Sequence, residues 1–219
     1  MKVLYRISNN SYKYKIKPDY LTKEATFTHF YNIFKEHDIF VVADNVNDEL
    51  YTFLLTFSEK VTILRTNLSN AGAFMYSVNY AIANFDDLDI VYFAEDDYIY
   101  KQNACGFIEG LEIADYCTGY DHPDLYNYES CKLKCTKSFI WRYGKSTTMT
   151  FAVKVNTIKR DLGIYKKHCS GVHPEDYWMF EELIQNGRTL VNPLPGLSTH
   201  GETAYFSPCV DWEKEFYIR

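Results

Sequence analysis

Two patterns of apolar and polar positions alternate along the first hundred residues. Short apolar runs that end in polar residues are typical of buried strands, and longer stretches with apolar residues three and four apart are typical of amphipathic helices. The short runs predict strands at residues 2–8, 38–45, 60–66 and 88–94. The longer stretches predict helices at 22–36, 47–57 and 67–85, the first two with Thr22 and Asn47 as N-caps.

This alternation predicts an α/β fold with a mostly parallel central sheet. Strands separated by helices are joined by right-handed crossovers, which place helices on both faces of the sheet. Ligands of such sheets bind beyond the carboxyl ends of the strands, so we expect the side chains at these ends to share one pocket. They are Ser8, Asp44, Arg65 and the acidic run Glu95, Asp96 and Asp97.

The second half of the chain is less regular and predicts a mixed arrangement of helices and strands. We expect a helix near residues 103–113, a two-stranded excursion around Gly144, and a helix that follows Pro174 and stops at Gly187. Residues 189–202 then predict a short strand and a Pro-rich turn that ends on His200. No Pro-, Gly- or Ser-rich linker interrupts the sequence, which favours a single domain over residues 1–219.

Composition narrows the classes of function. The formal net charge of −6 argues against a nucleic-acid binder, whose affinity rests on clustered Lys and Arg. The N-terminus turns polar after about seven residues and so lacks the apolar core of a signal peptide, and no apolar run approaches the ~18 residues of a membrane span. We therefore expect a cytoplasmic protein that does not span a membrane. Six cysteines are then expected as thiols. A zinc site at Cys131, Cys135 and Cys169 is disfavoured, because C-x-x-C spacing is missing.

The acidic run raises a question of charge. An apolar, aromatic strand ends on Glu95, Asp96 and Asp97, and buried carboxylates are costly unless they are paired, hydrogen-bonded or bound to a metal. Mg²⁺ and Mn²⁺ take carboxylate oxygens and bridge to phosphates. In a turn, Glu95 and Asp97 can converge on one ion while Asp96 points elsewhere. The alternative is that these acids are solvated loop residues or a helix cap.

With these motifs in order, the sequence resembles the GT-A fold of nucleotide-sugar-dependent glycosyltransferases. "EDD" at 95–97 is similar to the D-x-D motif that holds a metal against the donor diphosphate in that family, and "NAG" at 70–72 is similar to its N-x-G stretch beside the nucleoside. The resemblance implies that Asp44 contacts the nucleotide base and that Mn²⁺ or Mg²⁺ is bound by Glu95, Asp97 and His200. The predicted donor site is Ser8, Asp44, Arg65, Asn70, Gly72 and Asp96.

The resemblance also implies a catalytic carboxylate in the second half. "PED" at 174–176 looks like the helix start that carries the general base of inverting members, with Asp176 as first choice and Glu175 as second. The alternative is simple capping, because acids in a first turn are favoured by the helix dipole. The other five histidines are interpreted as structural.

Further candidates for ligand contacts are basic and aromatic. The segment from Lys13 to Lys17 is a candidate phosphate or base contact, or else a solvated strand face. Four aromatic side chains are candidates for a wall against a sugar ring, although each could equally be core. They are Trp141, Tyr143, Tyr177 and Trp178.

The sequence thus predicts a metal-dependent glycosyltransferase. Residues 1–100 would bind a nucleoside-diphosphate sugar, expected to be a UDP-sugar, and residues 101–219 a glycan or glycoprotein acceptor with a free hydroxyl. Asp176 as a candidate base favours a transfer that inverts the configuration at the anomeric carbon, but a retaining transfer stays open. One alternative is a sugar-phosphate nucleotidylyltransferase, which is disfavoured because "YRISNNSYKYK" lacks the glycines of a phosphate loop. Another is a nucleotide- or carbohydrate-binding module without catalysis.

Overall fold

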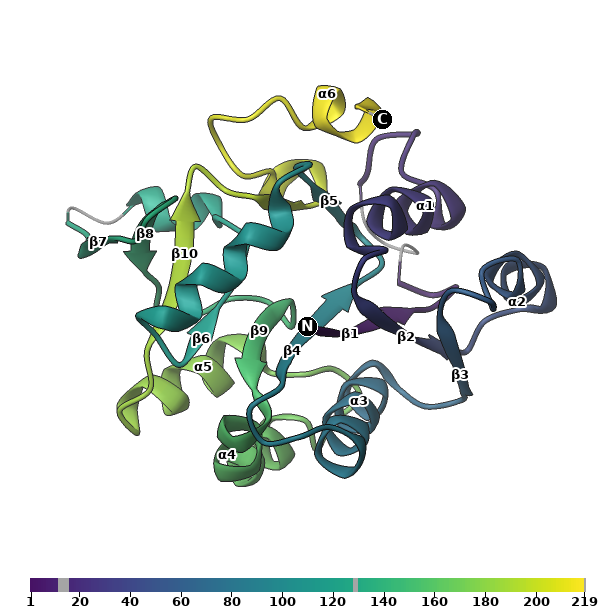
Figure 1. Ribbon diagram of the computed structural model, residues 1–219, viewed down its shortest axis with the longest axis horizontal. Coiled ribbons are helices and arrows are strands. Elements are labelled where there is room, and N and C mark those ends of the chain that lie inside the picture. The colour runs from purple at the N-terminus through teal and green to yellow at the C-terminus, as the bar shows by residue number, and fades with distance from the viewer. Residues whose placement is uncertain (12–15, 128–129, 219) are drawn as a thin grey trace.

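The computed structural model describes residues 1–11, 16–127 and 130–218. Within them, nine strands form one sheet in the order β3-β2-β1-β4-β9-β6-β10-β8-β7 (Figure 1). The first four strands of the chain are parallel neighbours: β1 (Lys2–Ile7), β2 (Asp38–Asp44), β3 (Thr62–Thr66) and β4 (Ile90–Glu95). All four lie at the predicted places.

Strands from the second half extend the same sheet. They are β6 (Tyr116–Cys117), β7 (Leu133–Cys135), β8 (Ile140–Tyr143), β9 (Phe151–Lys154) and β10 (Leu190–Leu194). Among the described strands of this sheet, β9 and β8 run against the others. The predicted α/β fold with a mostly parallel sheet and a mixed second half is confirmed.

Helices cover both faces of the sheet (Figure 1). Val3, Tyr5 and Ile7 of β1 point to one face, while Leu4 points to the other, because side chains alternate along a strand. The first face packs against α1 (Lys23–Phe34), α2 (Asp48–Leu55) and the 3-10 helix η1 (Ala104–Glu112). The second face packs against α3 (Asn70–Asn84), α4 (Val155–His168) and α5 (Asp176–Gln185).

The helix starts follow the capping rules. Thr22 Oγ1 accepts the Ala25 N–H and Asn47 Oδ1 accepts the Leu50 N–H, which confirms both predicted N-caps. Ser69 caps α3 in the same way, through the N–H of Gly72. These caps fix where the helices begin, and α2 and α3 each begin four residues after the preceding strand ends.

A second, two-stranded sheet forms above the end of β4. In it, β5 (Tyr98–Tyr100) pairs antiparallel with β11 (Ser198–His200), and His200 is the register partner of Tyr98. The remaining short helices are η2 (Pro123–Asn127), η3 (Thr203–Tyr205) and α6 (Trp212–Tyr217), the last beside α1 (Figure 1). The β5–β11 pair brings the C-terminal part of the chain to the acidic run.

The region around Gly144 differs from the prediction. It holds two strands, β8 and β9, but they are not partners: β8 pairs with β10 and β7, and β9 pairs with β4 and β6. The second of these strands, β9, also ends sooner than the predicted two-stranded segment, because α4 begins at Val155. Val155, Ile158 and Tyr165 share the buried side of α4, a helical spacing that the β-branched residues of this segment obscure.

No described helix combines the length and apolar character needed to cross a membrane.

Candidate functional site

A cleft of about 500 Å³ lies at the carboxyl ends of β1, β2 and β4. Its lining includes Val172 and His173, from the segment before α5, although the sequence predicts a structural role for His173. Six residues predicted for the site line the cleft together: Ser8, Asp44, Asn70, Glu95, Asp96 and Asp97. This follows from topology, because the carboxyl ends of parallel strands meet at one edge of a sheet.

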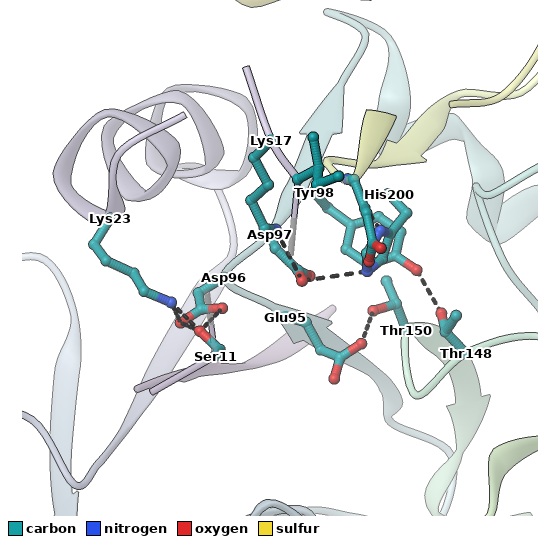
Figure 2. A network of polar contacts seen from close by, with 12 residues as sticks. Ser11, Lys17, Lys23, Glu95, Asp96, Asp97, Tyr98, Thr148, Thr150 and His200 are labelled. Carbon is teal, nitrogen blue, oxygen red and sulfur yellow. Dashed lines mark hydrogen bonds and ion pairs between the residues drawn. The ribbon is translucent and has the colours of Figure 1, made fainter. Parts of the chain in front are cut away.

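Each acid of the run is matched by its own cationic side chain. The ion pairs are Arg6 with Glu95 at 2.8 Å, Lys23 with Asp96 at 2.5 Å, and Lys17 with Asp97 at 3.1 Å. Figure 2 shows Asp96 turned toward Lys23 on α1 while Asp97 faces Lys17 and His200. The three carboxylates therefore point to three different partners, which limits their mutual repulsion.

Arg6 is the cation on the wall of the cleft, and sequence reasoning missed it. Its Nη2 donates to Glu95 Oε1, its Nη1 donates to Asn70 Oδ1 at 2.8 Å, and its guanidinium lies 5.3 Å from the Phe74 ring centre. Thr150 Oγ1 donates to the other oxygen of Glu95 at 3.2 Å. Arg6 thus joins β1, β4 and the start of α3. The available signal was an Arg inside an otherwise apolar strand.

Asp96 fastens the loop that follows β1. Its carboxylate accepts the Ser8 N–H and the Ser11 hydroxyl, both at 2.9 Å, as well as Lys23 (Figure 2). Burial lowers the pKa of Lys23, and the charge of Asp96 opposes that shift. A donor contact for Ser8 and Asp96 stays a prediction.

Asp97 and His200 meet across the small sheet. His200 Nε2 lies 3.2 Å from Asp97 Oδ2, so the pairing of β5 with β11 brings together two of the three predicted metal ligands. The Glu202 N–H donates to His200 Nδ1 at 3.1 Å. A neutral imidazole that accepts at Nδ1 carries its proton on Nε2. His200 therefore acts as a hydrogen-bond donor to Asp97.

This arrangement does not fit a divalent ion. A histidine that binds a metal through Nε2 cannot carry a proton there, and Glu95 is held by Arg6 rather than turned to Asp97. Within residues 1–11, 16–127 and 130–218, no three His, Cys, Asp or Glu side chains are grouped to hold a metal. Among the described residues, no such group contains a cysteine, and Cys131 and Cys135 are exposed.

Asp44 ends β2 and orders the next loop. Its Oδ1 accepts the Thr66 hydroxyl at 2.9 Å and the Leu68 N–H at 2.7 Å, and its Oδ2 accepts the Asn45 side-chain amide. Asn45 has a φ of 50°, a left-handed conformation that Asn tolerates. Asp44 is buried on the cleft wall, and its contact with a nucleotide base stays a prediction.

Two predicted donor residues do not line the cleft. Arg65 pairs with Asp48 at 3.0 Å and lies over the Tyr51 ring, on the outer side of β3. Gly72 lies in the first turn of α3, where a Cβ atom would be 3.1 Å from Leu68 Cβ. Its N–H is taken by the Ser69 cap, so Gly72 serves the helix start.

Of the two candidate bases, Asp176 is the one whose pKa responds to the charge of the acidic run. Burial raises the pKa of Asp176, the Tyr177 N–H opposes that shift, and the charge of Glu95 adds to it. Glu175 is mostly exposed and faces His168, whose Nδ1 lies 3.3 Å from its Oε2. The charge of Glu95 thus reaches Asp176, although neither Asp176 nor Glu175 is among the residues that line the cleft, and Glu175 faces His168.

The four candidate aromatic residues divide into two groups. Trp141 is fully buried and belongs to the core, and Tyr143 is partly buried against it. Tyr177 and Trp178, in the first turn of α5, are 48% and 59% exposed and pack edge to face. Only these two of the four present aromatic surface beside Asp176. Lys13 and Lys15 lie outside the described residues.

Comparison with known proteins shows the fold. No family model and no curated protein matches the sequence. A crystal structure of GalNAc-T7 with UDP, GalNAc and Mn²⁺ matches with a TM-score of 0.60 at 10% identity, covering 91% of this chain and 42% of that one. The chain thus spans about two fifths of the GalNAc-T7 chain. A 4-diphosphocytidyl-2C-methyl-D-erythritol synthase matches with a TM-score of 0.54 at 10% identity, covering 88% of both chains. The protein has the GT-A-like α/β fold that these structures share.

Proposed function

We propose that the protein is a glycosyltransferase that takes a sugar from a nucleoside-diphosphate donor, with UDP-sugars as the first candidates. The observation that carries this proposal is the cleft at the carboxyl ends of β1, β2 and β4. It collects six residues that the sequence predicts for donor or metal binding, and the charge of one of them, Glu95, contributes to the raised pKa of Asp176. The shared fold with GalNAc-T7, crystallised with UDP and GalNAc, supports the same class of donor.

The proposed reaction uses groups of this chain. An acceptor hydroxyl oxygen attacks the anomeric carbon of the donor and gives its proton to Asp176, while the bond from that carbon to the diphosphate breaks. Negative charge then develops on the departing nucleoside diphosphate, and the guanidinium of Arg6 on the cleft wall, which Glu95 holds in place, would stabilise it by hydrogen bonding. Attack from the side of Asp176, opposite the leaving group, gives inversion.

We place the acceptor beside the start of α5. Tyr177 and Trp178 are exposed next to Asp176, and aromatic faces are suited to pack on sugar rings. A glycan or glycoprotein acceptor would therefore lie over the second half of the chain. Mn²⁺ or Mg²⁺ on Glu95, Asp97 and His200 does not enter this mechanism, because those residues do not fit the ion as they are arranged.

The test is release of nucleoside diphosphate from a panel of nucleotide sugars in the presence of mixed glycan acceptors, with and without Mn²⁺. The wild-type protein should release one nucleoside diphosphate, and Asp176→Asn should not. Glu36→Gln, an exposed acid beyond α1, is the matched control and should behave like the wild type. Binding of the nucleotide without release from any donor would favour a binding module instead.

A nucleotidylyltransferase is the second candidate. The match to the 4-diphosphocytidyl-2C-methyl-D-erythritol synthase covers 88% of both chains, so the shared fold accounts for most of each protein. Formation of pyrophosphate from a sugar phosphate and a nucleoside triphosphate would favour this activity. The same panel, run with nucleoside triphosphates and sugar phosphates, decides between the two.

A further inference from the structure

Lys17, Asp97 and His200 form a buried cluster where the fold would otherwise place a metal. Lys17 Nζ and His200 Nε2 lie 3.1 Å and 3.2 Å from the same oxygen, Oδ2 of Asp97 (Figure 2). The side chains of Lys17 and Asp97 are only 5% and 3% exposed. Water contributes little here, so the charge of Asp97 is balanced by protein groups.

Backbone contacts hold this cluster in place. The Gly201 N–H donates to the Asp97 carbonyl at 2.6 Å, which fixes the end of β11 against the turn after β4. A Cβ atom on Gly201 would lie 2.8 Å from that carbonyl oxygen, so only glycine allows the approach. His200 is thereby held beside Asp97, with its Nε2 proton directed at the carboxylate.

The cation already on Asp97 limits what else this cluster can hold. Arg6, Lys23 and Lys17 each form an ion pair with one of the three acids. A divalent ion on Asp97 would have to displace Lys17 from Oδ2 or share that buried carboxylate with it, and two cations close together in a desolvated place repel each other. His200 Nε2 lies 3.2 Å from the same carboxylate oxygen, so a metal ion on that oxygen would also have to separate Asp97 from His200.

We propose that Lys17 takes the place of the divalent cation on Asp97, so that this chain binds the nucleoside-diphosphate part of its donor without a metal. This proposal rests on the proposed function and identifies Lys17 as the cation that assists binding of the donor. Asp97 lines the cleft and Lys17 Nζ lies 3.1 Å from its carboxylate, so Lys17 lowers the repulsion between Asp97 and an anionic diphosphate in the cleft beside Arg6. Lys17 acts as a positioning residue through Asp97.

The first experiment uses Mn²⁺ alone and needs no nucleotide. Electron paramagnetic resonance measures free Mn²⁺ during titration of the wild-type protein. We expect no stoichiometric Mn²⁺ site below millimolar concentration. One tight site in the wild type that is lost in Asp97→Asn would overturn the proposal, because Asp97 would then be a metal ligand.

The second experiment measures UDP binding by calorimetry, in EDTA and in Mn²⁺. The wild type should bind UDP equally in both. Lys17→Met should bind UDP about tenfold or more weakly in EDTA, because the charge of Asp97 then repels the diphosphate without Lys17 to oppose it. Lys17→Arg keeps the cation and should bind as the wild type does, as should Lys35→Met, an exposed control.

The outcomes separate this proposal from the proposed function. UDP binding that requires Mn²⁺, or Lys17→Met binding UDP in EDTA as tightly as the wild type, overturns the role of Lys17 and leaves a glycosyltransferase intact. If Lys17→Met fails to fold, the wild type in EDTA and the Mn²⁺ titration still decide. If UDP does not bind, the same titration is repeated with the nucleoside diphosphates of the other donors in the panel. If none of them binds under any condition, the proposed function fails, and the Mn²⁺ titration alone decides whether Asp97 holds a metal.

Discussion

Arg6 of β1 and Glu95 of β4 are register partners on neighbouring parallel strands, and their side chains form an ion pair of 2.8 Å. Lys2 of β1 and Asp38 of β2 are register partners as well and form an ion pair of 2.7 Å. The two pairs differ in burial: Arg6 and Glu95 are 6% and 21% exposed, against 29% and 64% for Lys2 and Asp38. Strand β1 therefore contributes both a buried ion pair, Arg6–Glu95, and a more exposed ion pair, Lys2–Asp38, that serves as its control.

Breaking the buried pair should cost far more stability than breaking the exposed one. Arg6→Met leaves Glu95 without its cation in a largely desolvated place, and we expect a loss of about 3 kcal/mol in the free energy of unfolding. Lys2→Met should cost about 1 kcal/mol or less. Urea unfolding followed by tryptophan fluorescence measures both.

A double-mutant cycle isolates the interaction itself. Arg6→Met combined with Glu95→Gln should be less destabilised than the sum of the single changes, by about 1 kcal/mol or more, because each change removes the charge that the other leaves unpaired. Lys2→Met with Asp38→Asn should show nearly additive effects. Equal coupling energies in the two cycles would contradict a special role for Arg6.

Much of the first half could be predicted because its signals are local. Apolar runs and helical stripes place β1 to β4 and α1 to α3 within a few residues, and capping by Thr22 and Asn47 is encoded within one turn. Crossover rules then make these strands parallel, so the meeting of Ser8, Asp44 and the acidic run at one edge could be foreseen, although the order of the strands could not.

The partners of the acids could not be foreseen, because they are set by long-range packing. The sequence predicts that a cation balances Glu95, Asp96 and Asp97, but Coulomb's law does not distinguish a metal from Arg6, Lys17 and Lys23, which come from three separate segments. Likewise, β5 and β11 are three residues each and pair with one another across about a hundred residues of sequence. Their pairing carries no local periodic signal.

Asp176→Asn should reduce glycosyl transfer about 100-fold or more while leaving UDP binding unchanged, as expected for loss of a general base. Asp176 must be ionised to take a proton, and burial raises its pKa above the ordinary 3.8. Transfer by the wild type should therefore fall as pH drops through that raised pKa. Steady-state rates between pH 4 and pH 8 measure the decline, at roughly the range where carboxylate bases titrate. Unchanged transfer by Asp176→Asn would remove this residue from the mechanism.

The same pKa shift predicts an effect on stability with a definite sign. The folded protein holds a proton on Asp176 more tightly than the unfolded chain does, so stability falls as pH rises from 3.8 through the raised pKa. Asp176→Asn removes this loss. We expect the variant to unfold at higher urea concentration than the wild type at neutral pH, with the difference shrinking toward pH 3.8. A variant less stable than the wild type at neutral pH would contradict the shift.

Gly201→Ala tests whether the β5–β11 pair positions His200. An added Cβ atom would lie 2.8 Å from both the Asp97 carbonyl oxygen and Leu21 Cδ1, and the carbonyl belongs to the backbone and cannot rotate away. We expect a loss of about 1–3 kcal/mol in the free energy of unfolding, the usual cost of overpacking. UDP binding should weaken as well, because His200 and Asp97 shift together with the end of β11.

Gly163→Ala is the matched control for this substitution. Gly163 lies inside α4, and a Cβ atom there would meet nothing within 4 Å. Alanine is the better helix former, so this variant should gain up to about 1 kcal/mol in the free energy of unfolding. Its UDP binding should not change, because α4 does not line the cleft. If Gly201→Ala instead resembles Gly163→Ala in both measurements, the close approach of β11 to Asp97 is not what holds His200 in place.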